Sequence, residues 1–223
     1  MLTSTNYSVP VHLLDIAKQQ IPSDDFKLTI NKPTGRFFYD PWVLIPEFKN
    51  TVWETLYNSL PVDKGEARII NLNAATCYRS HSDIDDRYHL NIVGENSYLI
   101  NLDSEEMHRI ERDGAWYELD TGPRHTAANF GRFIRVQLVI RKLLNQPTLI
   151  KPIKISITPV SAKDDTRFIF DDVISPWLNI ANKNNFINNF NFTQFNVTFD
   201  MEELALASLK DCLTNEFNLE ILV

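Results

Sequence analysis

Two histidines and an aspartate in the middle of the chain are candidate metal ligands. His81 and Asp83 are separated by one residue, so an extended backbone would place both side chains on one face. His125 follows the turn at residues 122–123 and could supply a third ligand from a neighbouring strand. Two imidazoles and one carboxylate are the donor set of the facial triad that holds non-haem Fe(II) and leaves coordination positions open. These residues therefore predict a non-haem iron site.

Three more polar residues stand where they could bind an anionic ligand beside such a metal. Arg135 lies within an apolar strand pattern, where an unpaired guanidinium would be costly to bury. A planar guanidinium holds a carboxylate through two parallel hydrogen bonds, which the point charge of lysine cannot reproduce. We therefore predict that Arg135 binds a carboxylate and that Arg87 and His89 serve the same site. Internal salt bridges are the alternative for these residues.

These motifs gain their meaning from their combination. A His-x-Asp pair often arises by chance, and a lone histidine is commonly structural. The sequence places His81-x-Asp83 first, then Arg87 and His89, then His125 and Arg135, all at spacings compatible with strands. This combination favours a metal and ligand-binding site over a chance match. Asp85, Asp86 and Asn129 are neighbouring polar residues to which the sequence assigns no role. His108 lies outside the pattern and is predicted to be a surface residue on a helix or loop.

The elements that must position these residues are mainly strands. In the expected strand 133–143, apolar residues alternate with Arg135 and Arg141, and the strand 87–93 alternates in the same way. The polar faces carry the proposed site residues, as expected if they line a barrel interior. The apolar faces would then be covered by two N-terminal helices, at 11–20 and 51–60. The other expected strands are 26–30, 67–72, 98–102 and 115–119.

Composition excludes several functional classes. The 223 residues are long enough for one catalytic core and an appendage, and only six of them are glycine, which disfavours a glycine-rich phosphate-binding fold. The net charge of −7 argues against nucleic-acid binding. The N-terminus lacks a signal-peptide pattern, and no apolar run approaches the ~20 residues of a membrane helix. We therefore expect a cytoplasmic protein that makes no membrane contact, with Cys77 and Cys212 reduced.

The sequence changes character after Gln146. An Asn-rich stretch at 179–196 contains aromatic residues that predict ordered packing, and 201–217 has the apolar spacing of an amphipathic helix capped by Asp200. We expect residues 1–146 to form the catalytic domain with its N-terminal helices. Residues 147–223 are expected to form a mixed, partly helical extension packed on that core. Four tryptophans are predicted to be core or interface residues: Trp42, Trp53, Trp116 and Trp177.

The ordered motifs resemble the aspartyl/asparaginyl β-hydroxylase family of Fe(II)/2-oxoglutarate-dependent oxygenases, which includes free-proline hydroxylases. The resemblance covers about residues 67–145. It rests on His81-Ser82-Asp83, on Arg87-Tyr88-His89-Leu90, and on His125-Thr126-Ala127-Ala128-Asn129 with Arg135. The run at 114–120 also resembles the family's approach to its distal histidine. Because Asp83 is kept, the chain is closer to the proline-hydroxylase branch.

The resemblance implies a function and a fold. His81, Asp83 and His125 would bind Fe(II), and no catalytic side chain is implied beyond these ligands. Arg135 would hold the distal carboxylate of 2-oxoglutarate, while Arg87 and His89 would serve the end nearer the metal, with O2 as the second co-substrate. The fold would be mainly β with flanking helices around a double-stranded β-helix, a cupin-like jelly roll. A monomer or homodimer hydroxylating a C–H bond of an amino acid, peptide or protein residue, of Asp/Asn or Pro type, is expected.

Two other classes of protein fit part of the pattern. A cupin-like enzyme could bind a metal through the same residues without using 2-oxoglutarate. A non-catalytic β-barrel interaction protein could carry the same histidines and aspartate by accident. Conversion of 2-oxoglutarate separates the first from the proposed oxygenase, and stoichiometric iron uptake separates the second.

Overall fold

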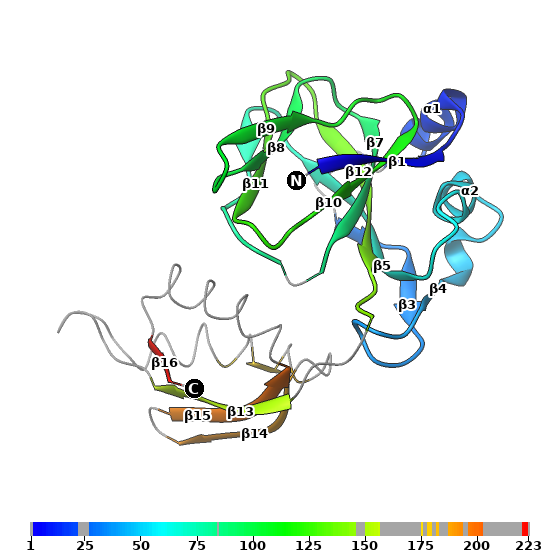
Figure 1. The fold of residues 1–223 in the computed structure, drawn as a ribbon. Coiled ribbons are helices and arrows are strands. Elements are labelled where there is room, and N and C mark those ends of the chain that lie inside the picture. The colour runs from blue at the N-terminus through cyan, green and yellow to red at the C-terminus, as the bar shows by residue number, and fades with distance from the viewer. Residues whose placement is uncertain are drawn as a thin grey trace. The chain divides into compact units, whose positions relative to one another are not determined.

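The computed structural model divides the chain into two compact units, Met1–Asn145 and Gln146–Val223. In the first unit it describes residues 2–21, 27–83 and 85–145. In the second it describes 150–156, 175, 178–179, 182, 187–193, 196–202 and 220–222. The described strands of both units pair in antiparallel sheets (Figure 1). The mainly β fold predicted for the first unit is confirmed, whereas a mixed, partly helical extension was predicted for the second.

Two antiparallel sheets form the frame of the first unit. The large sheet has the order β1-β10-β7-β12-β5-β2, and the small sheet has the order β6-β11-β8-β9. The strands of the large sheet are β1 (Leu2–Ser8), β2 (Lys27–Thr29), β5 (Lys64–Leu72), β7 (Arg87–Val93), β10 (Ala115–Leu119) and β12 (Arg135–Lys142). Those of the small sheet are β6 (Thr76–Cys77), β8 (Ser97–Asn101), β9 (Glu106–Arg109) and β11 (His125–Asn129).

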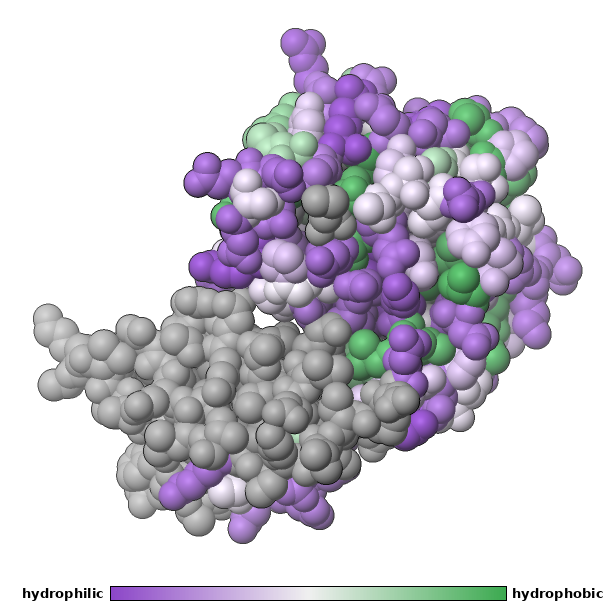
Figure 2. All heavy atoms as spheres, in the orientation of Figure 1, coloured by the Kyte–Doolittle hydropathy of each residue, from purple (hydrophilic) through white to green (hydrophobic). Residues whose placement is uncertain are grey.

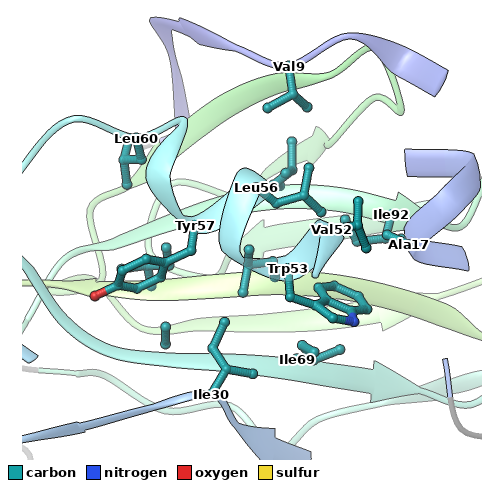
Figure 3. Packing of buried hydrophobic residues seen from close by; sticks show 14 of the residues in the cluster. Val9, Ala17, Ile30, Val52, Trp53, Leu56, Tyr57, Leu60, Ile69 and Ile92 are labelled. Atoms are coloured by element: carbon teal, nitrogen blue, oxygen red, sulfur yellow. The ribbon is translucent and has the colours of Figure 1, made fainter. Parts of the chain in front are cut away.

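Helices cover one face of the large sheet. They are α1 (Val11–Gln19) and α2 (Val52–Asn58), accompanied by a 3-10 turn at Pro46–Phe48 and a two-stranded ribbon of β3 (Asn31–Pro33) and β4 (Trp42–Leu44). Apolar side chains of the helices and of alternate strand positions form one buried cluster, which Figure 3 shows around α2. The alternation in β7 and β12 and the helical cover are therefore confirmed. Among the members are Leu14, Trp53, Leu56, Ile69, Leu90, Trp116, Leu138 and Ile140.

Helix α2 begins and ends where its sequence dictates. The side-chain oxygen of Thr51 accepts a hydrogen bond from the backbone N–H of Trp53 at 3.2 Å, which caps the helix. Its apolar residues recur at helical spacing, so one stripe faces the sheet and includes Leu56. Pro61 lies just after the helix and cannot continue it.

Replacing Leu56 with alanine tests this packing. The side chain is fully buried at the centre of the cluster, so we expect the free energy of unfolding to fall by about 2–5 kcal/mol. Urea unfolding followed by circular dichroism would measure the change. Leu102→Ala is the matched control, because that leucine is 42% exposed and should cost under about 0.5 kcal/mol. Equal losses in the two variants would contradict the assignment of the core.

The other face of the large sheet packs against the small sheet. Leu72 and Leu119 of the large sheet form a second buried cluster with Leu99 and Ala127 of the small sheet. We call this face of the large sheet the inner face. Because cross-strand partners share a face, Arg135 opposite Leu72 and Arg87 opposite Leu119 also lie on the inner face. The inner face therefore mixes apolar packing with buried polar residues.

The second unit contains a four-stranded antiparallel sheet with the order β14-β15-β13-β16. Its strands are β13 (Ile150–Ser156), β14 (Ile187–Thr193), β15 (Asn196–Glu202) and β16 (Glu220–Leu222). Val197, Phe199 and Met201 are buried on β15 while Thr198 between them is exposed, which is the two-residue period of a strand.

This two-residue strand period shows that the helix predicted at 201–217 is wrong at its N-terminal end. Met201 and Glu202 end β15 instead of beginning a helix, and Asp200 lies within the strand instead of capping one. Residues 203–217, the remainder of that predicted helix, lie outside the described residues. Part of the Asn-rich stretch forms β14, where Ile187 is buried.

Several features of the first unit also differ from the predictions. The polar N-terminal segment forms β1, an edge strand paired with β10, where polar side chains can face water. His108 belongs to β9 instead of a helix or loop. The tryptophans at 42, 53 and 116 are buried, as predicted, and Trp177 lies outside the described residues. Cys77 is an exposed free thiol, and Cys212 also lies outside them.

The described helices give no sign of a membrane span, since none is long and apolar enough to cross a bilayer. On the face of the first unit seen in Figure 2, hydrophilic side chains predominate, with small apolar patches between them.

Candidate metal centre

Backbone hydrogen bonds bring the three candidate ligands together. His81 and His125 form an isolated antiparallel bridge in which each backbone N–H donates to the other residue's carbonyl at 2.9 Å. The N–H of Asp83 donates to the carbonyl of Thr121 at 3.0 Å, which keeps the next residues alongside the same segment. One ligand atom from each of His81, Asp83 and His125 lies within 4.8 Å of the others. The structure thus places the residues predicted as metal ligands in one cluster.

The orientation of both imidazoles suits a metal. Each Nδ1 faces a backbone carbonyl, that of Arg79 at 2.9 Å from His81 and that of Pro123 at 3.0 Å from His125. When Nδ1 donates to a carbonyl, the proton is held there and the lone pair on Nε2 is free to ligate. The two Nε2 atoms point to Asp83 Oδ2, at 3.3 Å from His81 and 3.7 Å from His125. Two imidazole nitrogens and one carboxylate oxygen thus face one another, an arrangement that can hold a cation.

Arg87 holds the other oxygen of the ligand carboxylate. Its Nη2 lies 2.5 Å from Asp83 Oδ1, and its Nε lies 3.9 Å from Asp85 Oδ2. Burial raises the pKa of Asp83, but the hydrogen bond with His81 and the charge of Arg87 outweigh it and keep that pKa well below its ordinary value. Asp83 therefore remains ionised and oriented. The sequence placed Arg87 on a co-substrate, whereas the structure pairs it with the candidate metal ligand.

A buried charge network extends from Arg87 along the inner face. Arg141 pairs with Asp85, and its Nε lies 3.1 Å from Glu66 Oε2. Arg68 Nη2 lies 2.8 Å from the same Glu66 oxygen. Burial raises the pKa of Asp85 to about 6, although the charges of Arg141 and Arg87 oppose that rise. The sequence reasoning missed this network, whose only signal was the alternation that puts Arg141 on the same face as Arg135.

Two neighbouring residues left unassigned by sequence have structural roles. The side-chain amide of Asn129 donates to the carbonyls of Leu72 and Phe133, both at 2.9 Å, and so ties the end of β11 to its neighbours. Asp86 Oδ1 accepts a hydrogen bond from the backbone N–H of Thr121 at 3.3 Å. Both therefore support the backbone around the cluster.

Arg135 is buried without the carboxylate partner that its charge needs. It is 1% exposed, and neither Nε nor Nη1 has a hydrogen-bond partner. Its guanidinium lies 5.9 Å from the ring centroid of Tyr78, and burial lowers its pKa. Among the described residues no carboxylate pairs with it, so the alternative of an internal salt bridge is not observed there. An anionic ligand is the missing partner that chemistry suggests.

His89 lies two positions after Arg87 on β7, so it shares the inner face with Arg87. Its Nδ1 is 3.2 Å from Gln137 Oε1, and its Nε2 is buried without a partner. Burial lowers the pKa of His89 to about 3 with help from the charges of Arg135 and Arg87 and from His125, although the hydrogen bond with Gln137 opposes that fall. The imidazole is therefore neutral.

Metal affinity should depend on pH through His81. Ligation needs both lone pairs and an ionised carboxylate. The hydrogen bond to Asp83 raises the pKa of His81, so proton competition begins at a higher pH than for an ordinary imidazole of pKa ~6.5. As the pH falls below that value, we expect the Mn(II) dissociation constant to rise about tenfold per pH unit. Calorimetric titrations between roughly pH 5.5 and 8 would measure it, and a flat profile would contradict ligation by His81.

Comparison of the chain with known protein families gives no match, and no curated protein is found to be similar to it.

Proposed function

We propose that this protein is an Fe(II)- and 2-oxoglutarate-dependent dioxygenase that hydroxylates a C–H bond of an amino acid, peptide or protein residue. The observation that carries the proposal is the unpaired guanidinium of Arg135, buried on the inner face that also holds Arg87 and His89. A cluster of metal-ligand residues alone would suit many enzymes. Such a cluster together with the buried guanidinium of Arg135 suits a co-substrate that both chelates the metal and carries a second carboxylate.

The donor set fits Fe(II). His81, Asp83 and His125 offer two imidazole nitrogens and one carboxylate oxygen, which is the facial combination that leaves positions open for other ligands. The two Nδ1 atoms are already engaged by backbone carbonyls, so each Nε2 is the atom available to the metal. Asp83 Oδ2 faces both Nε2 atoms, at 3.3 Å from His81 and 3.7 Å from His125, so a cation bound there would contact all three residues.

The free donors of Arg135 suit a carboxylate. Nε and Nη1 have no hydrogen-bond partner, so the guanidinium keeps donors that a carboxylate ligand can accept from. His89 shares the inner face and has an unpartnered Nε2, so it offers a further polar atom for such a ligand. The two ends of 2-oxoglutarate would therefore meet a guanidinium at one end and the metal at the other.

The order of the strands supports a double-stranded β-helix. If β5 to β12 are numbered one to eight, the large sheet contains them in the order one-eight-three-six and the small sheet in the order two-seven-four-five. All pairings in both sheets are antiparallel. Two facing antiparallel sheets that share eight strands in this way are the arrangement of a jelly roll. In such a core the inner face is the natural place for a ligand.

The protein's own residues would bind and orient the metal and the co-substrate, and they exclude water. Arg87 fixes the rotamer of Asp83, and the carbonyls of Arg79 and Pro123 fix the imidazoles. Leu72 and Leu99 close the apolar side of the inner face. When bound, Fe(II), 2-oxoglutarate and O2 supply an oxidative decarboxylation that yields succinate and CO2 and places one oxygen atom in a C–H bond of the substrate.

An anaerobic absorption titration tests the proposal. We expect Fe(II) to bind stoichiometrically and 2-oxoglutarate then to produce a visible metal-to-ligand charge-transfer band. His81→Ala should lose both iron and band, while His12→Ala, which alters an exposed histidine on α1, should keep them. Iron binding without a band would instead favour a metal enzyme that does not use 2-oxoglutarate. Absence of iron binding would refute the catalytic proposal.

A further inference from the structure

Gln137 is a buried polar residue to which neither the sequence motifs nor the proposed metal site gives a role. It lies in the middle of β12, two positions after Arg135, so both side chains share the inner face. Its side chain is fully buried, its Oε1 is 3.2 Å from His89 Nδ1, and its own Nε2 has no partner. A buried amide that makes one hydrogen bond to a histidine controls that histidine's chemistry.

The hydrogen bond allows two arrangements of the proton. A neutral imidazole carries one N–H. If Gln137 Oε1 faces Nδ1, then Nδ1 is protonated and Nε2 of His89 can only accept. If the amide is turned over, Gln137 Nε2 donates to Nδ1, and His89 carries its proton on Nε2. The two arrangements occupy the same heavy-atom positions and differ only in the identity of the amide atoms.

The chemistry of a carboxylate ligand selects between them. A carboxylate only accepts hydrogen bonds, and Arg135 offers it two donors, Nε and Nη1, that have no other partner. His89 can add a third donor only from Nε2, because Nδ1 is occupied by Gln137. We infer that Gln137 fixes the proton of His89 on Nε2 when the carboxylate co-substrate binds, so that a neutral histidine acts as a hydrogen-bond donor. The inference rests on the proposed function, and it makes Gln137 a positioning residue.

Glutamine is suited to this role among residues of similar shape. Glutamate at the position could only accept, so it would hold the proton on Nδ1 or make His89 a cation, and its charge would repel a dicarboxylate. Leucine would leave Nδ1 without a partner and the tautomer free. Because the neutral amide can both donate and accept, it permits the Nε2–H form without adding charge.

Nitrogen NMR of histidine-labelled protein tests the inference. With Zn(II) as a diamagnetic metal and 2-oxoglutarate bound, we expect the wild-type His89 to carry its proton on Nε2. Gln137→Glu should move the proton to Nδ1 or protonate both nitrogens, already in the ligand-free protein. Gln137→Leu should give a mixture, whereas Gln19→Leu on α1 should leave His89 unchanged. Persistence of the Nδ1–H form in the wild-type complex would overturn the inference.

Binding measurements show whether Gln137 acts through His89. We expect Gln137→Leu to weaken 2-oxoglutarate binding about tenfold in the wild type and little in a His89→Phe background. Equal weakening in both backgrounds would overturn the inference, since Gln137 would then act directly on the ligand or through the fold. If 2-oxoglutarate fails to bind the wild type, the proposed function fails. In that case, a change of the His89 tautomer in ligand-free Gln137→Glu would still support the pairing, and an unchanged tautomer would refute it.

Discussion

Replacing Arg135 with methionine is expected to abolish 2-oxoglutarate binding and turnover while leaving the folded protein at least as stable as the wild type. The guanidinium is buried with no carboxylate partner among the described residues, and its Nε and Nη1 lack hydrogen bonds, so its charge is costly and methionine should be tolerated despite the lost contact with Tyr78. The same group would be fully paired once a carboxylate binds. Its removal should then weaken 2-oxoglutarate binding by roughly 100-fold or more.

Arg135→Met should lower the affinity for 2-oxoglutarate without lowering stability, and this combination distinguishes a ligand-binding role from a structural one. Thermal unfolding without ligand and anaerobic 2-oxoglutarate titration would measure them on the same samples. Arg132→Met is the matched control, because Arg132 is exposed in the loop just before β12 and should change neither quantity. Arg135→Lys should retain the charge and lose the bidentate contact, so its binding should lie between those of the wild type and Arg135→Met. A strong loss of stability in Arg135→Met would indicate a structural role instead.

Replacing His125 with alanine is expected to remove stoichiometric Fe(II) binding and with it all turnover. His125 contributes one of only two imidazoles in the cluster, and its side chain is buried against Asp83. Its loss leaves one nitrogen and one oxygen, which is too few ligands to hold the metal in a facial triad. The apolar cluster under α1 and α2 does not include His125, so the protein should still fold.

Metal-dependent stability separates loss of binding from loss of folding. Wild-type protein should unfold at a higher temperature when Mn(II) is added, because a ligand that binds only the folded state stabilises it. His125→Ala should unfold near the wild-type metal-free temperature and show no such rise, while His12→Ala should behave as the wild type. A metal-induced rise that survives in His125→Ala would show that the metal binds elsewhere.

The sequence was most informative where the candidate site residues lie in strands whose apolar and polar residues alternate. Alternation located β7 at its observed bounds and β12 to within two residues, because a strand with one apolar face is strongly specified by its pattern. The strand predicted at 115–119 also matches β10. The proximity of His81 and Asp83 followed from their spacing. Their approach to His125 depended on the pairing of distant segments, which the motifs suggested and the backbone bridge displays.

Other features depend on contacts that sequence patterns do not encode. The network of Asp85, Arg141 and Glu66 joins the segment just before β7 to β12 and β5, and no local spacing links its members. Strand β1 is mostly polar, with only Leu2 and Tyr7 packed against the apolar clusters, so its assignment rests on backbone pairing with β10. At 201–217 the apolar residues suggested a helix, but tertiary pairing with β13 made Met201 the end of a strand.

The backbone bridge between His81 and His125 has a consequence for how the protein would respond to metal shortage. The ligands are aligned by main-chain hydrogen bonds that exist without the ion, and the apolar core lies on the opposite face of the large sheet. Release of the ion would therefore affect only the contacts among the three ligand residues and leave the two sheets folded. The metal-free protein would remain able to bind iron again, so its proposed activity would follow the iron supply without refolding.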